Sequence, residues 1–509
     1  MNDAYSPYKA SRHPWITSAI QEADPSIVPA HVQLILSDLC NHSCDFCFPA
    51  GTQIRLADGS NRSIVRIALG DAVLDAFGEP RRVVGLFARE YAGELVQVSI
   101  FPCKTLTGTP DHVVHVMDLG GSRIQLPLKL IKKGHTLVSL DSPSLAAVVV
   151  AVDRVPHNDP VYNIEVEGSH TYVANSIAVN NCAYRTPGYS SSQLFYTTNP
   201  ALAGNLARDR KHPEHNYNPK RWIPTERALA LVEEMAALGV RAIQLTGGGE
   251  PTVNPAFAVV CQRIRELGME YAVVSNGSLV GARDLYKDFA GASWVRISVD
   301  AGIARTYATT RGTKAASFNA VWDTIKAIKT HGCPVVGIGF VVTPQNWQEI
   351  AVAAEMARDA GADNIRISAM FSPEGAALFR PFYEAAQRQC RAAKALETDR
   401  FRVFDRFGAR VEDLELQAPE YRHCRYQHYT TYIGADLNVY RCCVYSYNKR
   451  GLIGSVANQS FRDLWVSQKR MNDMLTFDAT SCERCQFNNL NRFLNYLTAS
   501  EDPPHANFV

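Results

Sequence analysis

Thirteen cysteines are the clearest chemical feature of this 509-residue sequence, because nine of them fall into two groups. Cysteine thiolates act as nucleophiles and metal ligands, and in a reducing compartment they do so more often than they form disulfides. The two groups are Cys40, Cys44, Cys47 and Cys182, and Cys424, Cys442, Cys443, Cys482 and Cys485. The other four, Cys103, Cys261, Cys333 and Cys390, are scattered and are expected to be small buried hydrophobic residues. Two separate sites of thiol chemistry are therefore expected.

The overall composition excludes several classes of function. Lys plus Arg is 52 and Asp plus Glu is 50, and this near balance gives no electrostatic footprint for nucleic acid or an anionic membrane. The longest apolar runs are about eight residues, against roughly 20 for a membrane span. The N-terminal stretch MNDAYSPYKASRHPW is polar and lacks the apolar core of a secretory signal. We expect a cytoplasmic protein of about three domains.

From about residue 225 onward, apolar strands alternate with amphipathic helices. Six strands are predicted, at 32–37, 241–246, 271–275, 294–299, 335–342 and 364–368. Strands joined by helical crossovers form parallel sheets, so the fold class is α/β, with a partial (β/α)6 barrel of the TIM type. Chemistry on such a sheet sits on the loops that follow the strands.

Residues 47–181 break this scheme. Short Val- and Ile-rich strands separated by glycine turns predict an all-β block, inserted after the first barrel strand. The block opens with Cys47, contains TGTPDHVVHV at 107–116, ends with VYNIEVEGSHTYVANSIAVNN at 161–181 and is followed by Cys182. In this order these segments resemble the sequence blocks of a self-splicing mini-intein of the Hedgehog/intein (Hint) fold.

The resemblance implies a series of acyl transfers. Cys47 would attack the Phe46 carbonyl to form a thioester, with Thr109 positioning the peptide and His112 protonating its nitrogen. Cys182 would take over the acyl group, and Asn181 would cyclise to release the block.

Two positions depart from the family pattern, which commonly has Asp at Asn163 and His at Asn180. His170 remains and would assist both late steps. We therefore expect splicing to be slow or conditional.

Excision of 47–181 would place Cys182 after Phe46, so that Cys40, Cys44 and Cys182 form CxxxCxxC. This motif resembles the signature of radical S-adenosylmethionine (radical SAM) enzymes. Three thiolates would hold a 4Fe-4S cluster whose open iron binds S-adenosylmethionine. One-electron reduction by a donor such as flavodoxin or ferredoxin would cleave this cofactor to a 5′-deoxyadenosyl radical, which abstracts hydrogen from a substrate, either a peptide or a small molecule.

Further segments after predicted strands match the same family. Glu250 closes the run Gly247, Gly248 and Gly249 and would receive the methionyl ammonium. Contacts to the ribose and carboxylate of the cofactor would come from Ser275, Asn276, Arg296, Ser298 and Asp300.

The second cysteine group lies in a segment that resembles the twitch or SPASM extension of radical SAM enzymes. It comprises Cys424, ADLNVYRCC at 435–443, GLIGSVANQSFRDLW at 451–465 and CERC at 482–485. The resemblance implies an auxiliary 4Fe-4S cluster on Cys424, Cys442, Cys482 and Cys485, with Cys443 as the substitute for Cys442. A tetrahedral zinc site is the alternative. Leu437 stands where the family usually has glycine.

The predicted organisation has four segments: 1–46 with the first barrel strand, the mini-intein 47–181, the remaining barrel 182–395, and the auxiliary cluster domain 396–509. Residues 184–223 are either a substrate lid or a solvated surface loop. The competing reading of the whole chain is a splicing-impaired intein in a host that binds clusters or zinc without turnover.

Overall fold

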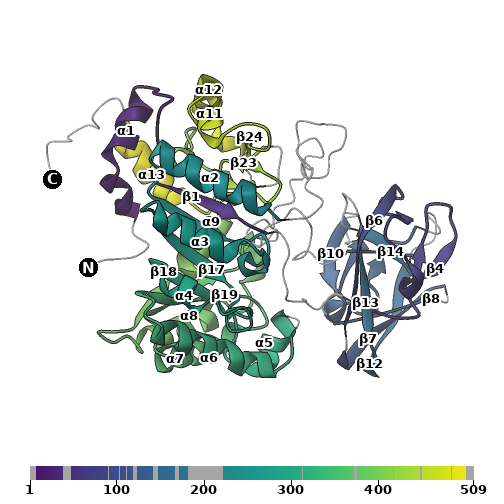
Figure 1. The fold of residues 1–509 in the computed structure, drawn as a ribbon. Coiled ribbons are helices and arrows are strands. Elements are labelled where there is room, and N and C mark those ends of the chain that lie inside the picture. The colour runs from purple at the N-terminus through teal and green to yellow at the C-terminus, as the bar shows by residue number, and fades with distance from the viewer. Residues whose placement is uncertain are drawn as a thin grey trace. The chain divides into compact units, whose positions relative to one another are not determined.

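The chain forms two compact units in the computed structural model, Met1–Asn41 with Pro187–Val509, and His42–Thr186 (Figure 1). The structure describes residues 7–37, 47–89, 91–102, 104–110, 112–117, 123–140, 147–166, 171–180, 222–311, 313–371, 375–416, 418–446, 450–482 and 484–499. We call the first unit the host unit and the second the β unit.

The host unit contains a parallel sheet built in chain order. Its strands run β21 (Arg402–Asp405), β20 (Asn364–Ala369), β19 (Val336–Val342), β18 (Trp294–Ser298), β17 (Glu270–Ser275), β16 (Ala242–Thr246) and β1 (His31–Ile35), each parallel to its neighbours. Strands β1 and β16 are adjacent although the β unit lies between them in the sequence. The six predicted strands and the α/β class are confirmed, and β21 is a seventh parallel strand that we did not predict.

Helices connect these strands: α2 (Thr225–Leu238), α3 (Phe257–Glu266), α4 (Tyr286–Ala290), α5 (Ala304–Arg311), α6 (Ala316–Thr330), α7 (Ile350–Asp359), α8 (Tyr383–Lys394) and α9 (Phe407–Glu415). Alternate strand residues such as Ile297, Ile338 and Ile365 are buried in one core with these helices. Because successive strand residues point to opposite faces, Arg296 and Arg366 lie on the other face, which we call the polar face.

The C-terminal segment continues the same sheet. Strand β22 (Thr430–Ile433) pairs parallel to β1, and β23 (Asn438–Tyr440) and β24 (Leu452–Ser455) follow antiparallel. Around them lie α1 (Pro14–Gln21), α10 (Tyr426–Tyr429), α11 (Phe461–Trp465), α12 (Gln468–Thr476) and α13 (Asn488–Leu497). The predicted boundary at residue 395 precedes β21, and it stays a prediction.

The β unit has two sheets, one of ten strands and one of four, and no α-helix among its described residues. The four-stranded sheet is β2 (Phe48–Pro49), β13 (Val161–Val166), β6 (Pro80–Arg89) and β5 (Ala72–Leu74). The larger sheet contains β3 (Gln53–Arg55), β4 (Asn61–Ser63), β7 (Ala92–Ile100), β8 (Lys104–Gly108), β9 (Val113–Met117), β10 (Arg123–Pro127), β11 (Thr136–Leu137), β12 (Ala147–Asn158), β14 (Thr171–Ala174) and β15 (Ile177–Asn180). The apolar residues of both sheets of the β unit form one core, as expected for an all-β insertion.

Among the helices that the structure describes, none combines the length and apolar character needed to cross a bilayer.

Candidate functional site

Cys47 is held on both sides by Thr109. The Cys47 N–H, which belongs to the peptide bond after Phe46, donates to Thr109 Oγ1 at 2.9 Å. In return the Thr109 N–H and hydroxyl donate to the Cys47 carbonyl at 2.9 and 3.2 Å. Both residues are buried. Thr109 therefore fixes the peptide nitrogen at the predicted splice junction, 62 positions away in the chain.

His112 lies on the same short connection, between β8 and β9. Its N–H donates to the Thr109 carbonyl at 2.9 Å, and its ring packs on Phe48 with 3.8 Å between centroids. The ring is fully buried. The structure thus places the predicted pair Thr109 and His112 on one turn beside the residue that follows Cys47.

Asn163 occupies a buried position on β13. Its Oδ1 accepts a hydrogen bond from the Tyr172 hydroxyl at 2.7 Å and one from the Ile164 N–H at 2.8 Å. Tyr172 is also fully buried, its ring lies edge-on to Phe48, and burial together with nearby Cys47 raises its pKa. Sequence reasoning missed Tyr172, although it lies in the HTYVAN segment.

The two ends of the insertion meet at β9. Cys47 is hydrogen-bonded to Thr109, shortly before β9 begins. Strand β15 pairs with β9 through Val179 and Val114. The backbone of Asn180 pairs with Thr171 across the β14–β15 hairpin. The predicted residues Cys40, Cys44, His170, Asn181 and Cys182 lie outside the described residues, as does the side chain of Asn180.

In the host unit, the glycine-rich turn follows β16. The Gly249 N–H donates to the Ser37 carbonyl at 3.0 Å, just after β1 and three residues before Cys40. A side chain at Gly247 would put its Cβ 1.6 Å from the Gly249 carbonyl oxygen, so this tight turn requires glycine there. The turn therefore lies against the segment that leads to the predicted cluster ligands.

Glu250 joins this turn to the end of β17. Its Oε1 accepts from Thr252 Oγ1 at 2.6 Å, the Thr252 N–H at 3.1 Å and Ser275 Oγ at 2.8 Å. Its Oε2 accepts from the Asn276 N–H at 2.7 Å. Burial raises the pKa of this carboxyl, and the four hydrogen bonds oppose that shift. Three of the predicted cofactor residues, Glu250, Ser275 and Asn276, are thus brought into one hydrogen-bonded group.

Asp300 follows β18 and connects it to β19. Its Oδ1 accepts from the Val341 N–H at 2.7 Å, its Oδ2 pairs with Arg311, and its carbonyl accepts from Asn346 Nδ2 at 2.9 Å. Arg296 and Ser298 lie on the polar face of β18, and the Arg296 guanidinium lies 5.1 Å from the Trp294 ring centroid. Sequence reasoning missed Arg311 and Asn346, which hold the Asp300 turn in place.

Three cysteines of the second group, Cys442, Cys482 and Cys485, lie near Cys424. Asn491 Nδ2 lies 3.8 Å from Cys424 Sγ and 4.0 Å from Cys485 Sγ. Burial raises the pKa of Cys442, Cys482 and Cys485. Cys443 raises the pKa of Cys442 further, and Cys424 raises the pKa of all three. Such thiols are protonated unless a cation stabilises their thiolates, so this donor set fits a metal group.

Cys443 has a different environment from the other four. It is buried, and Gln486 Nε2 donates to its Sγ at 2.5 Å. Burial raises the pKa of Cys443 to about 11, and the hydrogen bond with Tyr432 and the charge of Arg410 oppose this shift. This arrangement favours Cys442 over Cys443 in the set of four.

Within the described ranges, no three His, Cys, Asp or Glu side chains gather tightly enough to hold a single metal ion.

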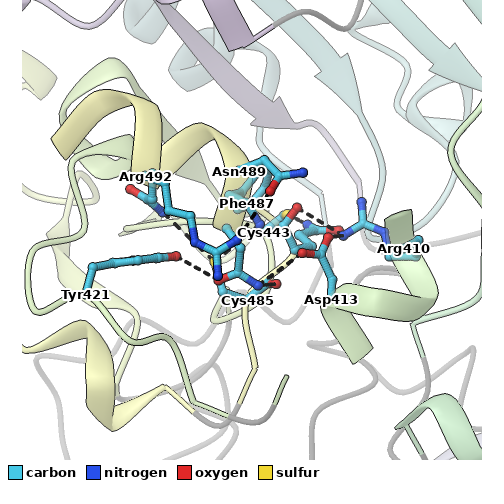
Figure 2. A network of polar contacts seen from close by, with 11 residues as sticks. Arg410, Asp413, Tyr421, Cys443, Cys485, Phe487, Asn489 and Arg492 are labelled. Carbon is cyan, nitrogen blue, oxygen red and sulfur yellow. Dashed lines mark hydrogen bonds and ion pairs between the residues drawn. The ribbon is translucent and has the colours of Figure 1, made fainter. Parts of the chain in front are cut away.

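A polar network fixes the loop that carries Cys485 (Figure 2). Asn488 Nδ2 donates to the Cys485 carbonyl at 2.8 Å and to Asp413 Oδ1 at 3.1 Å, and Asn488 Oδ1 accepts from the Tyr421 hydroxyl at 3.0 Å. Arg410 Nη1 donates to the Gln486 carbonyl at 3.0 Å. Helix α9 of the host sheet and the cysteine loop are therefore joined directly.

Leu437 adopts a left-handed conformation with φ +63° in the turn between β22 and β23. Its N–H donates to the Gly434 carbonyl at 2.9 Å. A non-glycine residue pays about 1–2 kcal/mol in this conformation. The turn that the family makes with glycine is thus present here with leucine.

Family models match two segments of the chain: the radical SAM superfamily over residues 198–357, and the SPASM iron-sulfur cluster-binding domain over residues 424–486. A radical SAM domain implies a 4Fe-4S cluster and S-adenosylmethionine, and a SPASM domain implies auxiliary iron-sulfur clusters. These matches favour an iron-sulfur cluster over zinc at the second cysteine group.

Similar curated proteins include the Fe-coproporphyrin III synthase of Methanosarcina barkeri, 33% identical over 130 residues, which are 25% of this chain and 31% of that protein. An S-adenosylmethionine-dependent nucleotide dehydratase of Flammeovirga pacifica is 32% identical over 82 residues, 16% of this chain and 28% of that protein. The matched segments span less than a third of either relative.

Solved structures similar to this chain include two that correspond to about a quarter of it. The intein-like domain from Clostridium thermocellum is 29% identical, with 27% of this chain and 99% of that chain covered and a TM-score of 0.24. The gp41-1 intein is 20% identical, with 26% and 98% covered and a TM-score of 0.23.

Proposed function

The chain carries a radical SAM domain and a SPASM iron-sulfur cluster-binding domain, and from this premise we propose that it is the precursor of a radical SAM enzyme that matures by splicing out residues 47–181. Splicing would join Phe46 to Cys182, so that Cys182 replaces Cys47 as the cysteine three positions after Cys44 and the host keeps CxxxCxxC. The observation that carries the proposal is that Thr109 forms hydrogen bonds with both the N–H and the carbonyl of Cys47.

The first step is an N-to-S acyl shift. Cys47 Sγ attacks the Phe46 carbonyl, the carbon–nitrogen bond breaks, and the proton ends on the Cys47 nitrogen. Thr109 holds that nitrogen through the Cys47 N–H, and His112, on the same turn, supplies the proton. The product is a thioester between Phe46 and Cys47.

The later steps use the other end of the insertion. Cys182 Sγ attacks the thioester and displaces the Cys47 thiolate. The Asn181 side-chain nitrogen then attacks its own carbonyl, which breaks the peptide bond to Cys182 and leaves a succinimide. The freed Cys182 amine takes the acyl group from its own sulfur, which gives a normal peptide bond. The pairing of β15 with β9 supports this route, because it brings the chain before Asn180 next to the strand that follows His112.

In the spliced host, Cys40, Cys44 and Cys182 would hold the 4Fe-4S cluster of the radical SAM site. Bound together, the cluster and S-adenosylmethionine supply a hydrogen-abstracting radical. Gly247 allows the tight backbone turn beside Ser37, and Glu250 fixes this turn to Ser275 and Asn276. Cys424, Cys442, Cys482 and Cys485 would hold the auxiliary cluster. A low-potential protein such as flavodoxin or ferredoxin would supply the electron.

The thioester can be trapped directly. In the Asn181→Ala chain, the late steps are blocked, so added hydroxylamine is expected to release a fragment ending at Phe46. The matched Thr109→Ala, Asn181→Ala chain should release it far more slowly. Absence of this fragment from the Asn181→Ala chain would contradict splicing and favour a splicing-impaired insertion.

The host activity is tested separately on the product of splicing. After reconstitution with iron and sulfide and chemical reduction, it should convert S-adenosylmethionine to methionine and 5′-deoxyadenosine. Bound iron without any cleavage would instead indicate a host that holds clusters without turnover.

A further inference from the structure

Two arginines flank a glycine on the polar face of the host sheet. Residues in register on neighbouring strands share a face, and Gly339 of β19 is in register with Ser298 of β18 and Arg366 of β20. A Cβ at Gly339 would lie 3.4 Å from Arg296 Cδ. The Arg296 side chain therefore lies beside Gly339 on one side, and Arg366 lies on the other side. Gly339 contributes no side chain between the two arginines.

Arg366 belongs to a group of three arginines from three consecutive elements. Arg406 follows β21, and its N–H donates to the Ile367 carbonyl of β20 at 2.8 Å. Arg410 lies on α9, with its guanidinium 5.6 Å from the ring centroid of Phe371, just after β20. All three side chains are half-buried. The group therefore sits toward the carboxyl end of β20, the end at which parallel α/β sheets carry their chemistry.

The charges of Arg366 and Arg406 act on the guanidinium of Arg410. Burial lowers the pKa of Arg410 to about 10, Asp413 opposes this shift, and the charges of Arg366 and Arg406 add to it. Asp413 Oδ2 pairs with Arg410 at 3.3 Å, while its Oδ1 accepts from Asn488. Burial and neighbouring positive charge both disfavour the charged form of Arg410, and a bound anion would stabilise it.

We propose that Arg366, Arg406 and Arg410 bind a carboxylate or phosphate group of the substrate, so that the substrate of the radical reaction is an anion. Planar guanidinium forks match both groups through paired hydrogen bonds. The bound anion would lie near the predicted cofactor residue Ser298 in the row Ser298, Gly339, Arg366. It would also lie near the auxiliary cluster loop, because Arg410 donates to the Gln486 carbonyl. This inference rests on the proposed radical SAM activity of the host.

The experiment is titration calorimetry of the spliced, reconstituted chain with two probes, inorganic pyrophosphate and citrate, at about 0.15 M ionic strength to screen weak surface binding. Saturable binding is expected, and whichever probe binds more tightly identifies the anion as phosphate or carboxylate. Arg366→Gln and Arg406→Gln should each weaken binding by at least about tenfold, the worth of one charge-assisted hydrogen bond. Arg366→Lys, which keeps the charge and perturbs folding least, should weaken it less. Arg391→Gln, at an exposed position on α8, is the matched control and should bind as the parent does.

Two results would overturn the proposal. One is no saturable binding of either probe, or equal binding by all variants. The other is unchanged binding together with a shifted reduction potential of the auxiliary cluster in Arg366→Gln, which would show that the arginines balance the charge of the cluster instead. Cleavage of S-adenosylmethionine is measured in parallel, because its loss with retained anion binding counts against the proposed activity and not against this site.

Discussion

The β unit and the host unit position their reactive groups in different ways. In the β unit, Thr109 and His112 lie on one turn, and Thr109 contacts the peptide nitrogen that splicing would release. In the host unit, the predicted cofactor residues are tied to one another: Glu250 binds Ser275 and Asn276, and Asp300 binds the end of β19. In the function we propose, the first region would act on its own backbone, whereas the second would prepare turns that receive a cofactor.

This difference determines what a substitution should do. A group that touches the reacting peptide affects a rate, because it acts in the transition state. A group that ties turns together affects binding and stability first, because the cofactor supplies the chemistry. The predictions below test this distinction in order of decreasing effect.

The largest effect is expected at Thr109. Thr109→Ala removes the acceptor of the Cys47 N–H and leaves that buried donor unpaired, and we expect the first acyl shift to slow by about 100-fold, as for loss of one catalytic hydrogen bond. Thr109→Ser keeps the hydroxyl and should splice within a few-fold of the parent. The measurement is the time course of precursor loss by mass spectrometry. If the two variants splice equally fast, the hydroxyl does not act in the reaction.

An intermediate effect is expected at the two adjacent cysteines of the host. Cys442→Ser should lower bound iron and auxiliary-cluster absorbance strongly, because Cys442 lies near Cys424 and Cys482. Cys443→Ser is the matched control and should keep the iron, since the Cys443 sulfur accepts a hydrogen bond from Gln486 and is not in the proposed ligand set. The reverse pattern of iron content would make Cys443 the ligand.

These two regions also show what the sequence could and could not reveal. The strands of the sheet, the all-β insertion and the glycine turn at 247–249 were predictable, because periodicity, turn residues and local motifs encode them. Tyr172, Arg311 and Asn346 were not, because a hydroxyl or amide acquires its role only when distant segments meet. Strand β21 was missed because it has only four residues, too few for a periodic signal.

The three arginines on the polar face illustrate the same limit. Arg366, Arg406 and Arg410 are ordinary charged residues in the sequence, far from any motif. The hydrogen bond from the Arg406 N–H to the Ile367 carbonyl and the position of Arg410 beside the Phe371 ring place these two residues near Arg366, on or just after β20. A pattern search finds residues that act through their neighbours in sequence, and it misses those that act through neighbours in space.

The smallest effect is expected at Leu437. Leu437→Gly should stabilise the turn by about 1 kcal/mol, because glycine adopts φ +63° without the steric cost. Leu437→Ala is the matched control, since it keeps a Cβ and should not stabilise. Denaturant unfolding of the spliced host measures both. A loss of stability in the glycine variant would show that the leucine side chain contributes more by packing than the backbone costs.

The most direct test of the central claim is the intact mass of the purified product, for the parent chain and for Asn181→Ala. The account predicts that the parent product is shorter by residues 47–181 and that Asn181→Ala does not yield this product. This result would make Cys182 the third cysteine of CxxxCxxC. A single full-length species from both chains would contradict the account, and would mean that Asn163 and Asn180 have disabled splicing.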